Sequence, residues 1–157
     1  MNDEATPHYQ DIIDQMRFGM KFCMEEFGVL SNTQWTIDPF GHSAAHALLM
    51  SQLGFKQIVV NRIHYQDYKE RLNSGRLQFI YRPFNNKLGK KILYHVIPYH
   101  YGQGQCEFCA EEFKPNKESS LIASSAEKMI NNIMRIRKGY TNQDIIMHLM
   151  GDDFTYT

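Results

Sequence analysis

Two aspartates stand directly after runs of residues that are typical of β-strands. Asp38 ends such a run in "WTIDPFGHS" (residues 35–43), and Asp153 closes "DIIMHLMGDD" (residues 144–153). If both runs are parallel strands of one sheet, their carboxyl ends share the edge where α/β proteins bind ligands. Two carboxylates across a cleft can hydrolyse a glycosidic bond, one as nucleophile and one as acid/base. The same pair can instead bind a metal ion.

Neither aspartate by itself is evidence of a catalytic site. An acidic residue after a strand is often an N-cap or a turn residue, and Pro39 and Gly41 favour a turn at Asp38. An unpaired charge at the tip of a buried strand costs free energy, so a catalytic Asp38 should lie next to a cation. Spacing alone leaves the structural and the catalytic interpretations open.

A helix near the N-terminus has the clearest local signals. Thr6 fits its N-cap, Pro7 its first helical position and Gly28 the position after its end. Apolar residues recur at steps of three and four between these limits, which predicts one buried stripe. The stripe comprises Tyr9, Ile12, Ile13, Met16, Met20, Cys23 and Phe27.

A strand, a short helix and a second strand follow, which predicts a βαβ unit and a parallel sheet of the α/β class. Ser43 is the expected N-cap of the short helix, and Gly54 is its stop signal. The second strand is a continuous β-branched run, as in strands covered on both faces. In order, the expected elements are strand 34–38, helix 44–53, strand 56–61, helix 67–75, extended segments 76–83 and 91–99, loop 102–119, helix 120–138 before Gly139, and strand 144–150.

Composition excludes several classes of protein. The chain has 157 residues, which is about the size of one domain, and it is 43% hydrophobic, so a packed core is expected. Its 17 basic and 17 acidic residues balance, which argues against a nucleic-acid partner. No apolar run reaches the roughly 18 residues that a membrane-spanning helix needs. Three cysteines are too few for a disulfide scaffold.

The amino-acid sequences of four segments resemble those of one protein family. "WTIDPFGHS" resembles a segment of the α-mannosidases of glycoside hydrolase family 38. "DEATPHY" (3–9), "NRIHYQD" (61–67) and "MGDDF" (150–154) are similar to further segments of that family in the same order, so the resemblance covers essentially the whole chain. The first and second of these three look more like the lysosomal branch than the Golgi branch.

The resemblance implies roles for individual residues. Asp38 matches the nucleophile, which is also a zinc ligand, and Asp153 matches the acid/base residue. Phe40 and Arg62 match positions that line the sugar subsite, and Tyr101 matches a tyrosine that contacts substrate. These roles imply zinc-dependent, retaining hydrolysis of terminal α-D-mannosyl residues of a glycan, with the carboxyl groups about 5 to 5.5 Å apart. Zinc would orient the sugar, and the Arg62 guanidinium would favour an ionised carboxylate nearby.

The match to the family is incomplete. The family's zinc site also uses a His-x-Asp pair on an earlier strand and a distant histidine, and no H-x-D triplet occurs here. The family's catalytic domain is a larger (β/α) barrel. The resemblance therefore implies that residues 1–157 are the middle of one incomplete barrel-like catalytic domain, which is inactive when expressed alone. A catalytically dead homologue that acts as a carbohydrate-binding module is the alternative.

Histidines and cysteines offer further metal-binding patterns. His42 and His46 are four residues apart at a helix start, a spacing that can bind zinc, although His42 also fits a hydrogen bond within the turn. Cys106 and Cys109 could join two upstream histidines in a structural zinc site, and a non-enzymatic zinc module is thus another possible function. The family implies instead a local disulfide in this loop, and two free thiols remain open. The upstream histidines are His95 and His100.

The family also implies a location, the lysosome or another secretory compartment. Nothing in the residues fixes the oligomeric state.

Overall fold

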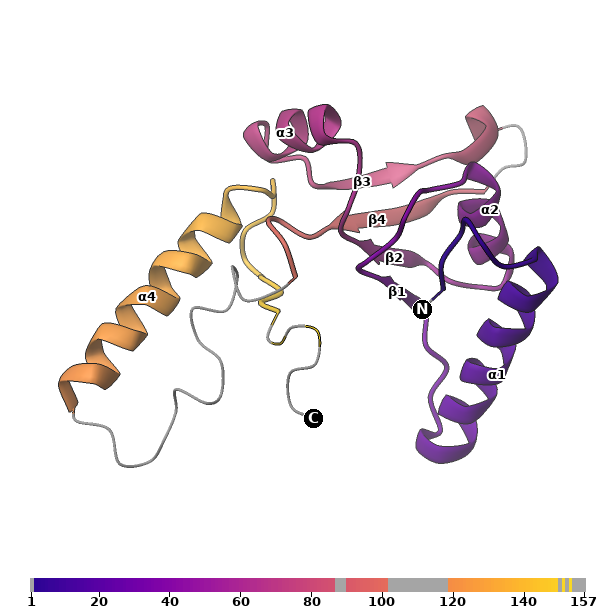
Figure 1. Ribbon diagram of the computed structural model, residues 1–157, viewed down its shortest axis with the longest axis horizontal. Coiled ribbons are helices and arrows are strands. Elements are labelled where there is room, and N and C mark those ends of the chain that lie inside the picture. Colours follow the sequence, from indigo (N-terminus) through magenta and orange to yellow (C-terminus); the bar gives the residue numbers. More distant parts are fainter. Residues whose placement is uncertain (1, 87–89, 102–118, 150, 152, 154–157) are drawn as a thin grey trace. The chain divides into compact units, whose positions relative to one another are not determined.

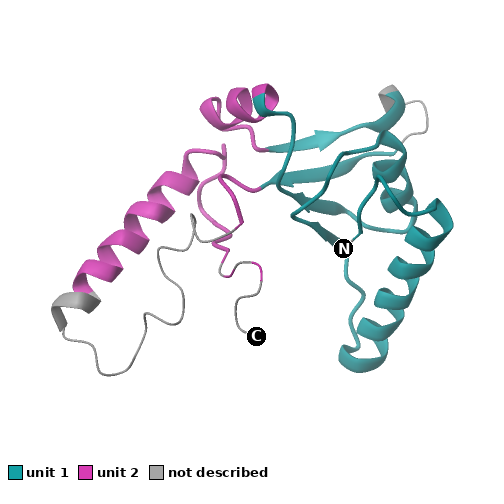
Figure 2. Cartoon of the chain, in the orientation of Figure 1, with its two compact units in different colours: residues 1–65, 78–96 teal, residues 66–77, 97–157 magenta. Residues whose placement is uncertain are grey.

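The computed structural model describes residues 2–86, 90–101, 119–149, 151 and 153. They fall into two compact units (Figure 2). Unit 1 comprises residues 1–65 and 78–96 and contains the sheet. Unit 2 comprises residues 66–77 and 97–157 and contains most of α3 and all of α4.

Unit 1 is built on a four-stranded sheet with the order β1-β2-β4-β3 (Figure 1). The α/β class is confirmed, and the sheet is mostly parallel: β1 pairs with β2 and β2 with β4 in parallel, while β3 is antiparallel to β4. Residues 82–91, which include the short helix η1, connect β3 to β4, whereas a parallel pair needs a crossover of about a dozen residues or more. The bounds are β1 Thr33–Thr36, β2 Gln57–Val60, β3 Gln78–Tyr81, η1 Pro83–Asn86 and β4 Ile92–Val96.

The βαβ prediction is confirmed in β1, α2 (Ala44–Gln52) and β2. The Ser43 side chain caps α2 by accepting a hydrogen bond from the Ala45 amide at 3.1 Å. Gly54 follows the helix with φ +99°, a conformation that favours glycine. In β2, Ile58, Val59 and Val60 are all buried, as the β-branched run predicts. The crossover fixes where the carboxyl ends of β1 and β2 lie.

Helix α1 (Tyr9–Phe27) begins two residues later than predicted. Thr6 is not its N-cap, and the Thr6 hydroxyl instead donates a hydrogen bond to Asp3 at 3.4 Å. His8 is the cap instead, and its Nδ1 accepts a hydrogen bond from the Gln10 amide at 3.3 Å. The C-terminal prediction is confirmed: Gly28 has φ +67° and ends the helix.

The predicted stripe of α1 is buried only in its first half. Ile12 and Met16 are buried, whereas Tyr9 and Phe27 are 64% and 69% exposed, so the prediction is wrong at both ends. A hollow of about 370 Å³ lies between the second half of α1 and β1. Its lining includes Met16, Met20, Cys23, Thr33, Trp35 and Phe55.

Unit 2 contains α3 (Tyr65–Asn73), which begins in unit 1, and α4 (Ser119–Arg137). After α4 the chain passes close to Leu77, because a Cβ atom at Gly139 would lie 2.6 Å from a Leu77 methyl group. The predicted strand at 144–150 is wrong over the described residues 144–149, which pair with no other described strand. Ile145 is 90% exposed there, and a strand needs a hydrogen-bonded neighbour.

Other predictions fall outside the described residues or concern membranes. The expected loop at 102–119 is outside the described part of the chain up to residue 118, and α4 begins at Ser119. Among the described helices, none combines the length and the apolar character that crossing a bilayer requires.

Candidate functional site

Asp38 and Arg62 occupy equivalent positions beyond two neighbouring parallel strands. β1 and β2 are in a register that aligns Thr36 with Val60, and each site residue lies two positions further along. The Arg62 Nε donates a hydrogen bond to Asp38 Oδ1, and the two side chains form an ion pair. The expected cation beside Asp38 is therefore present at the carboxyl edge of the sheet.

This ion pair lies at an open surface. The side chains of Arg62 and Asp38 are 48% and 28% exposed, so the pair contributes only about 0–1 kcal/mol to stability. Phe40 is 70% exposed, and the Arg62 guanidinium carbon lies 5.9 Å from the centre of its ring. Asp38 Oδ2 has no hydrogen-bond partner among the described residues. A carboxylate oxygen, a cation and an aromatic face are thus available together to a polar ligand.

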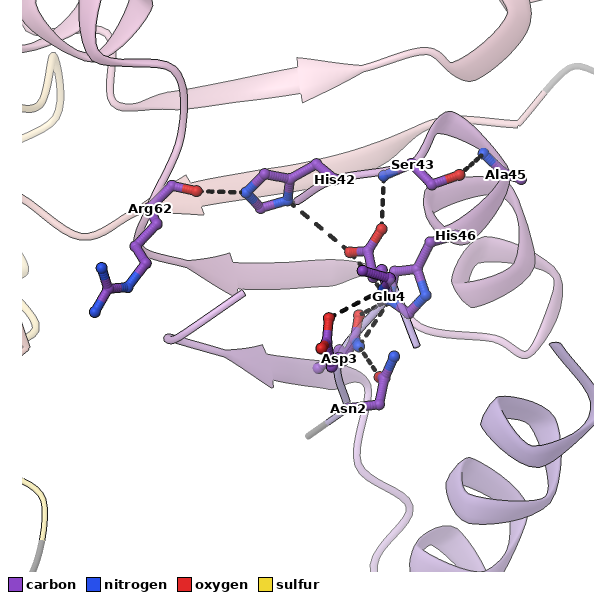
Figure 3. Close-up of polar contacts among 10 residues, drawn as sticks. Asn2, Asp3, Glu4, His42, Ser43, Ala45, His46 and Arg62 are labelled. Atoms are coloured by element: carbon purple, nitrogen blue, oxygen red, sulfur yellow. Dashed lines mark hydrogen bonds and ion pairs between the residues drawn. The ribbon is translucent and has the colours of Figure 1, made fainter. Parts of the chain in front are cut away.

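His42 connects Arg62 to a buried carboxylate (Figure 3). His42 Nε2 lies 2.6 Å from the backbone oxygen of Arg62, so this nitrogen carries the hydrogen, because a carbonyl oxygen only accepts. His42 Nδ1 lies 3.9 Å from Glu4 Oε1. His42 does make a hydrogen bond, but the prediction that it lies within the turn is wrong, because the acceptor is the backbone oxygen of Arg62.

Glu4 was not predicted as part of the site. Its side chain is 6% exposed, and its Oε2 accepts a hydrogen bond from the Ser43 amide at 2.6 Å. Burial raises the pKa of the Glu4 carboxyl above its ordinary value, although the Ser43 hydrogen bond opposes this shift. The only sequence signal for Glu4 is that it lies in "DEATPHY", because a contact across 39 residues leaves no local pattern.

His46 is buried on the other side of Glu4. Its Nε2 lies 3.8 Å from Glu4 Oε1 and within hydrogen-bond distance of the Gln34 side-chain amide, at 2.9 Å. Burial lowers the pKa of His46 to about 4, and the nearby His42 adds to the shift. The two histidines therefore have protein partners, and the described residues contain no group of three side chains suited to holding a metal ion.

The shift at His46 predicts a loss of stability in acid. The folded protein resists protonating His46, whereas the unfolded chain accepts the proton near pH 6.5. The free energy of unfolding should therefore fall by up to about 3 kcal/mol as the pH drops from 6.5 to about 4, and level off below that. Urea unfolding across this range measures the effect.

A His46→Gln variant isolates this contribution. His95, whose pKa burial also lowers to about 4, acts in the same direction, and the raised pKa of Glu4 acts in the opposite one. The variant should have a shallower pH dependence than the parent. Identical slopes would show that His46 is not buried in its neutral form.

The other two predicted site residues lie in unit 2. Tyr101 is 7% exposed, and its ring is 4.3 Å from that of His100. Asp153 is exposed and does not follow a strand in the described residues, so the structural premise for placing it at a strand tip is wrong. Asp38 belongs to unit 1. Its convergence with Asp153 remains a prediction.

The described residues support only part of the predicted zinc chemistry. Asp38 has a carboxylate oxygen of the type that zinc binds, and it is the single ligand that the resemblance places in this chain. Cys106 and Cys109 lie outside the described residues. His95 Nδ1 is 2.7 Å from the Gln78 side-chain amide. A complete metal site would need ligands beyond those described.

Comparisons with known proteins identify the family. The model of the glycosyl hydrolases family 38 N-terminal domain matches residues 1–157. The chain is 32% identical to the lysosomal alpha-mannosidase of Dictyostelium discoideum, 33% to an alpha-mannosidase of Canavalia ensiformis and 34% to the lysosomal alpha-mannosidase of Bos taurus, in each case over 99% of its residues. It spans 16–17% of the length of these relatives. The chain therefore belongs to glycosyl hydrolase family 38.

Proposed function

We propose that the protein containing these residues is a retaining α-mannosidase that hydrolyses terminal α-D-mannosyl residues of glycans. The observation that carries the proposal is the pairing of Asp38 with Arg62 at the ends of adjacent parallel strands, within a chain of family 38. The names of the relatives agree with this activity.

Asp38 would act as the nucleophile. Its carboxylate would attack the anomeric carbon of the sugar and form a covalent glycosyl-enzyme, while a second carboxyl protonates the leaving oxygen. Arg62 holds Asp38 through an Oδ1 hydrogen bond and leaves Oδ2 open for attack. Phe40 would form an apolar wall of the sugar subsite next to Arg62.

Asp153 would be the acid/base residue, and Tyr101 would contact the substrate. Both roles come from the resemblance. After the glycosyl-enzyme forms, Asp153 would take a proton from water as the water attacks the anomeric carbon, so the configuration is retained. Asp38 would also be a ligand of zinc, which when bound would supply positive charge that orients the sugar hydroxyls.

The architecture and the location are also proposals. We infer that the sheet belongs to a barrel-like domain, of which residues 1–157 form part. The parallel β1-β2-β4 arrangement supports this inference. The position of β1 supports it too, because β1 has a described partner strand on one side only. The lysosomal names of two relatives favour a lysosomal or another secretory location.

Turnover of a nitrophenyl α-mannoside tests the function. The complete polypeptide that carries this segment should release nitrophenol, should lose turnover after zinc is chelated and should regain it when zinc is returned. Residues 1–157 expressed alone should show no turnover. Mannose binding without turnover by the complete polypeptide would indicate the dead homologue instead, and turnover by the 157 residues would contradict the proposed need for ligands from elsewhere.

A further inference from the structure

Glu4 lies beside the segment that follows Asp38 and makes contacts there through both carboxylate oxygens. Oε2 accepts the hydrogen bond from the Ser43 amide at 2.6 Å, which holds the N-cap of α2 from outside the helix. Oε1 faces His42 Nδ1 at 3.9 Å and His46 Nε2 at 3.8 Å (Figure 3). One carboxylate thus reaches the end of "WTIDPFGHS" and the first turn of α2.

The contacts continue from Glu4 to the ion pair. The opposite nitrogen of the His42 ring is 2.6 Å from the Arg62 backbone oxygen, and the Arg62 side chain bonds to Asp38. Glu4 is therefore separated from the backbone of Arg62 by a single ring. The segment 38–43 is held at its start by Arg62 and at its end by Glu4, which constrains where Asp38 can point.

This position is costly for a carboxylate. The Glu4 side chain is 6% exposed, and burial of its charge works against folding, as the raised pKa indicates. A neutral glutamine could accept the Ser43 hydrogen bond with the same side-chain length. A charge that is kept at the expense of stability is characteristic of residues that position a functional site.

We propose that Glu4 is a positioning residue: its carboxylate holds the Ser43 amide and lies against the His42 ring, and it thereby sets the orientation of Asp38 and Arg62. The proposal rests on the function proposed above for Asp38. Glu4 itself touches neither Asp38 nor the Arg62 side chain in the described contacts, so it acts through His42 and the backbone.

Glu4→Gln in the complete polypeptide tests this role. The variant should fold at least as stably as the parent, because it removes a buried charge. Its kcat for a nitrophenyl α-mannoside should fall about tenfold to a hundredfold with little change in KM, since small errors in placing a reacting group have effects of this size. Glu25→Gln is the matched control, because Glu25 is an exposed residue of α1 that pairs with Lys21. An unchanged kcat in Glu4→Gln would overturn the proposal.

A double-mutant cycle tests the route through His42. If Glu4 acts in part through that ring, adding Glu4→Gln to His42→Ala should lower kcat by less than the product of the two single effects, the remainder coming from the Ser43 bond. Losses that multiply would show that the two residues act independently and would overturn the route. If Glu4→Gln does not fold, Glu4→Asp retains the charge with a shorter reach and should give an intermediate kcat, whereas parental kcat would count against the proposal.

Hydrogen exchange separates this inference from the proposed activity. Replacing the charged acceptor with a neutral one weakens the bond from the Ser43 amide, so that amide should exchange about tenfold faster in Glu4→Gln than in Glu25→Gln. If the parent shows no turnover, the proposed function fails, but this measurement still decides whether Glu4 holds the segment. Equal exchange at Ser43 would overturn that role.

Discussion

Replacing Asp38 with asparagine is expected to lower the kcat/KM of the complete polypeptide for a nitrophenyl α-mannoside by at least about a thousandfold. An amide of the same shape cannot form the glycosyl ester through which a retaining enzyme works. Asp38 is 28% exposed and makes one described ion pair, so the fold should survive the change. Steady-state rates and circular dichroism measure the two effects.

Asp14→Asn is the control, because Asp14 is an exposed aspartate of α1 whose described partner is the Gln10 side chain. A fluorosugar that slows hydrolysis of the glycosyl-enzyme should label Asp38 in the parent, as read by peptide mass spectrometry. Labelling of another carboxylate, or an active Asp38→Asn enzyme, would remove Asp38 from the role of nucleophile.

Replacing Asp153 with asparagine is expected to have an effect that depends on the leaving group. For a mannosyl-mannose substrate, kcat/KM should fall by about a hundredfold to ten-thousandfold, because the leaving oxygen is no longer protonated. For a dinitrophenyl mannoside it should fall far less, since that leaving group departs without a proton. Azide, which needs no general base, should then restore turnover and give the mannosyl azide with retained configuration.

Asp144→Asn is the control for this change, because Asp144 is an exposed aspartate earlier in the same segment. Equal losses for both substrates, with no response to azide, would contradict the acid/base role. Such a result would leave Asp153 with a binding or structural role only.

Local signals predicted the elements that position the ion pair. Ser43 and Gly54 delimit α2 as expected, and the β-branched run is a buried strand. The failures have different causes. At α1 a neighbouring residue, His8, caps the helix in place of Thr6, whose hydroxyl bonds to Asp3. Residues 144–149 have strand-like composition, but a strand depends on a distant partner and none is described.

The sequence likewise predicted part of the candidate site. Motif and spacing placed Asp38 and Arg62 at neighbouring strand ends, and the register of β1 and β2 confirms that geometry. Glu4 could not be found in this way. Its contacts with Ser43 and His42 depend on the tertiary placement of the N-terminal segment, which no local periodicity encodes.

The hollow between α1 and β1 has a practical use in experiments on residues 1–157. Trp35 is the single tryptophan of the sequence, lines the hollow and is 38% exposed. Its fluorescence therefore reports on the seating of the helix against the edge strand without an added dye. The same emission spectrum can show whether a variant of these 157 residues has kept its native packing.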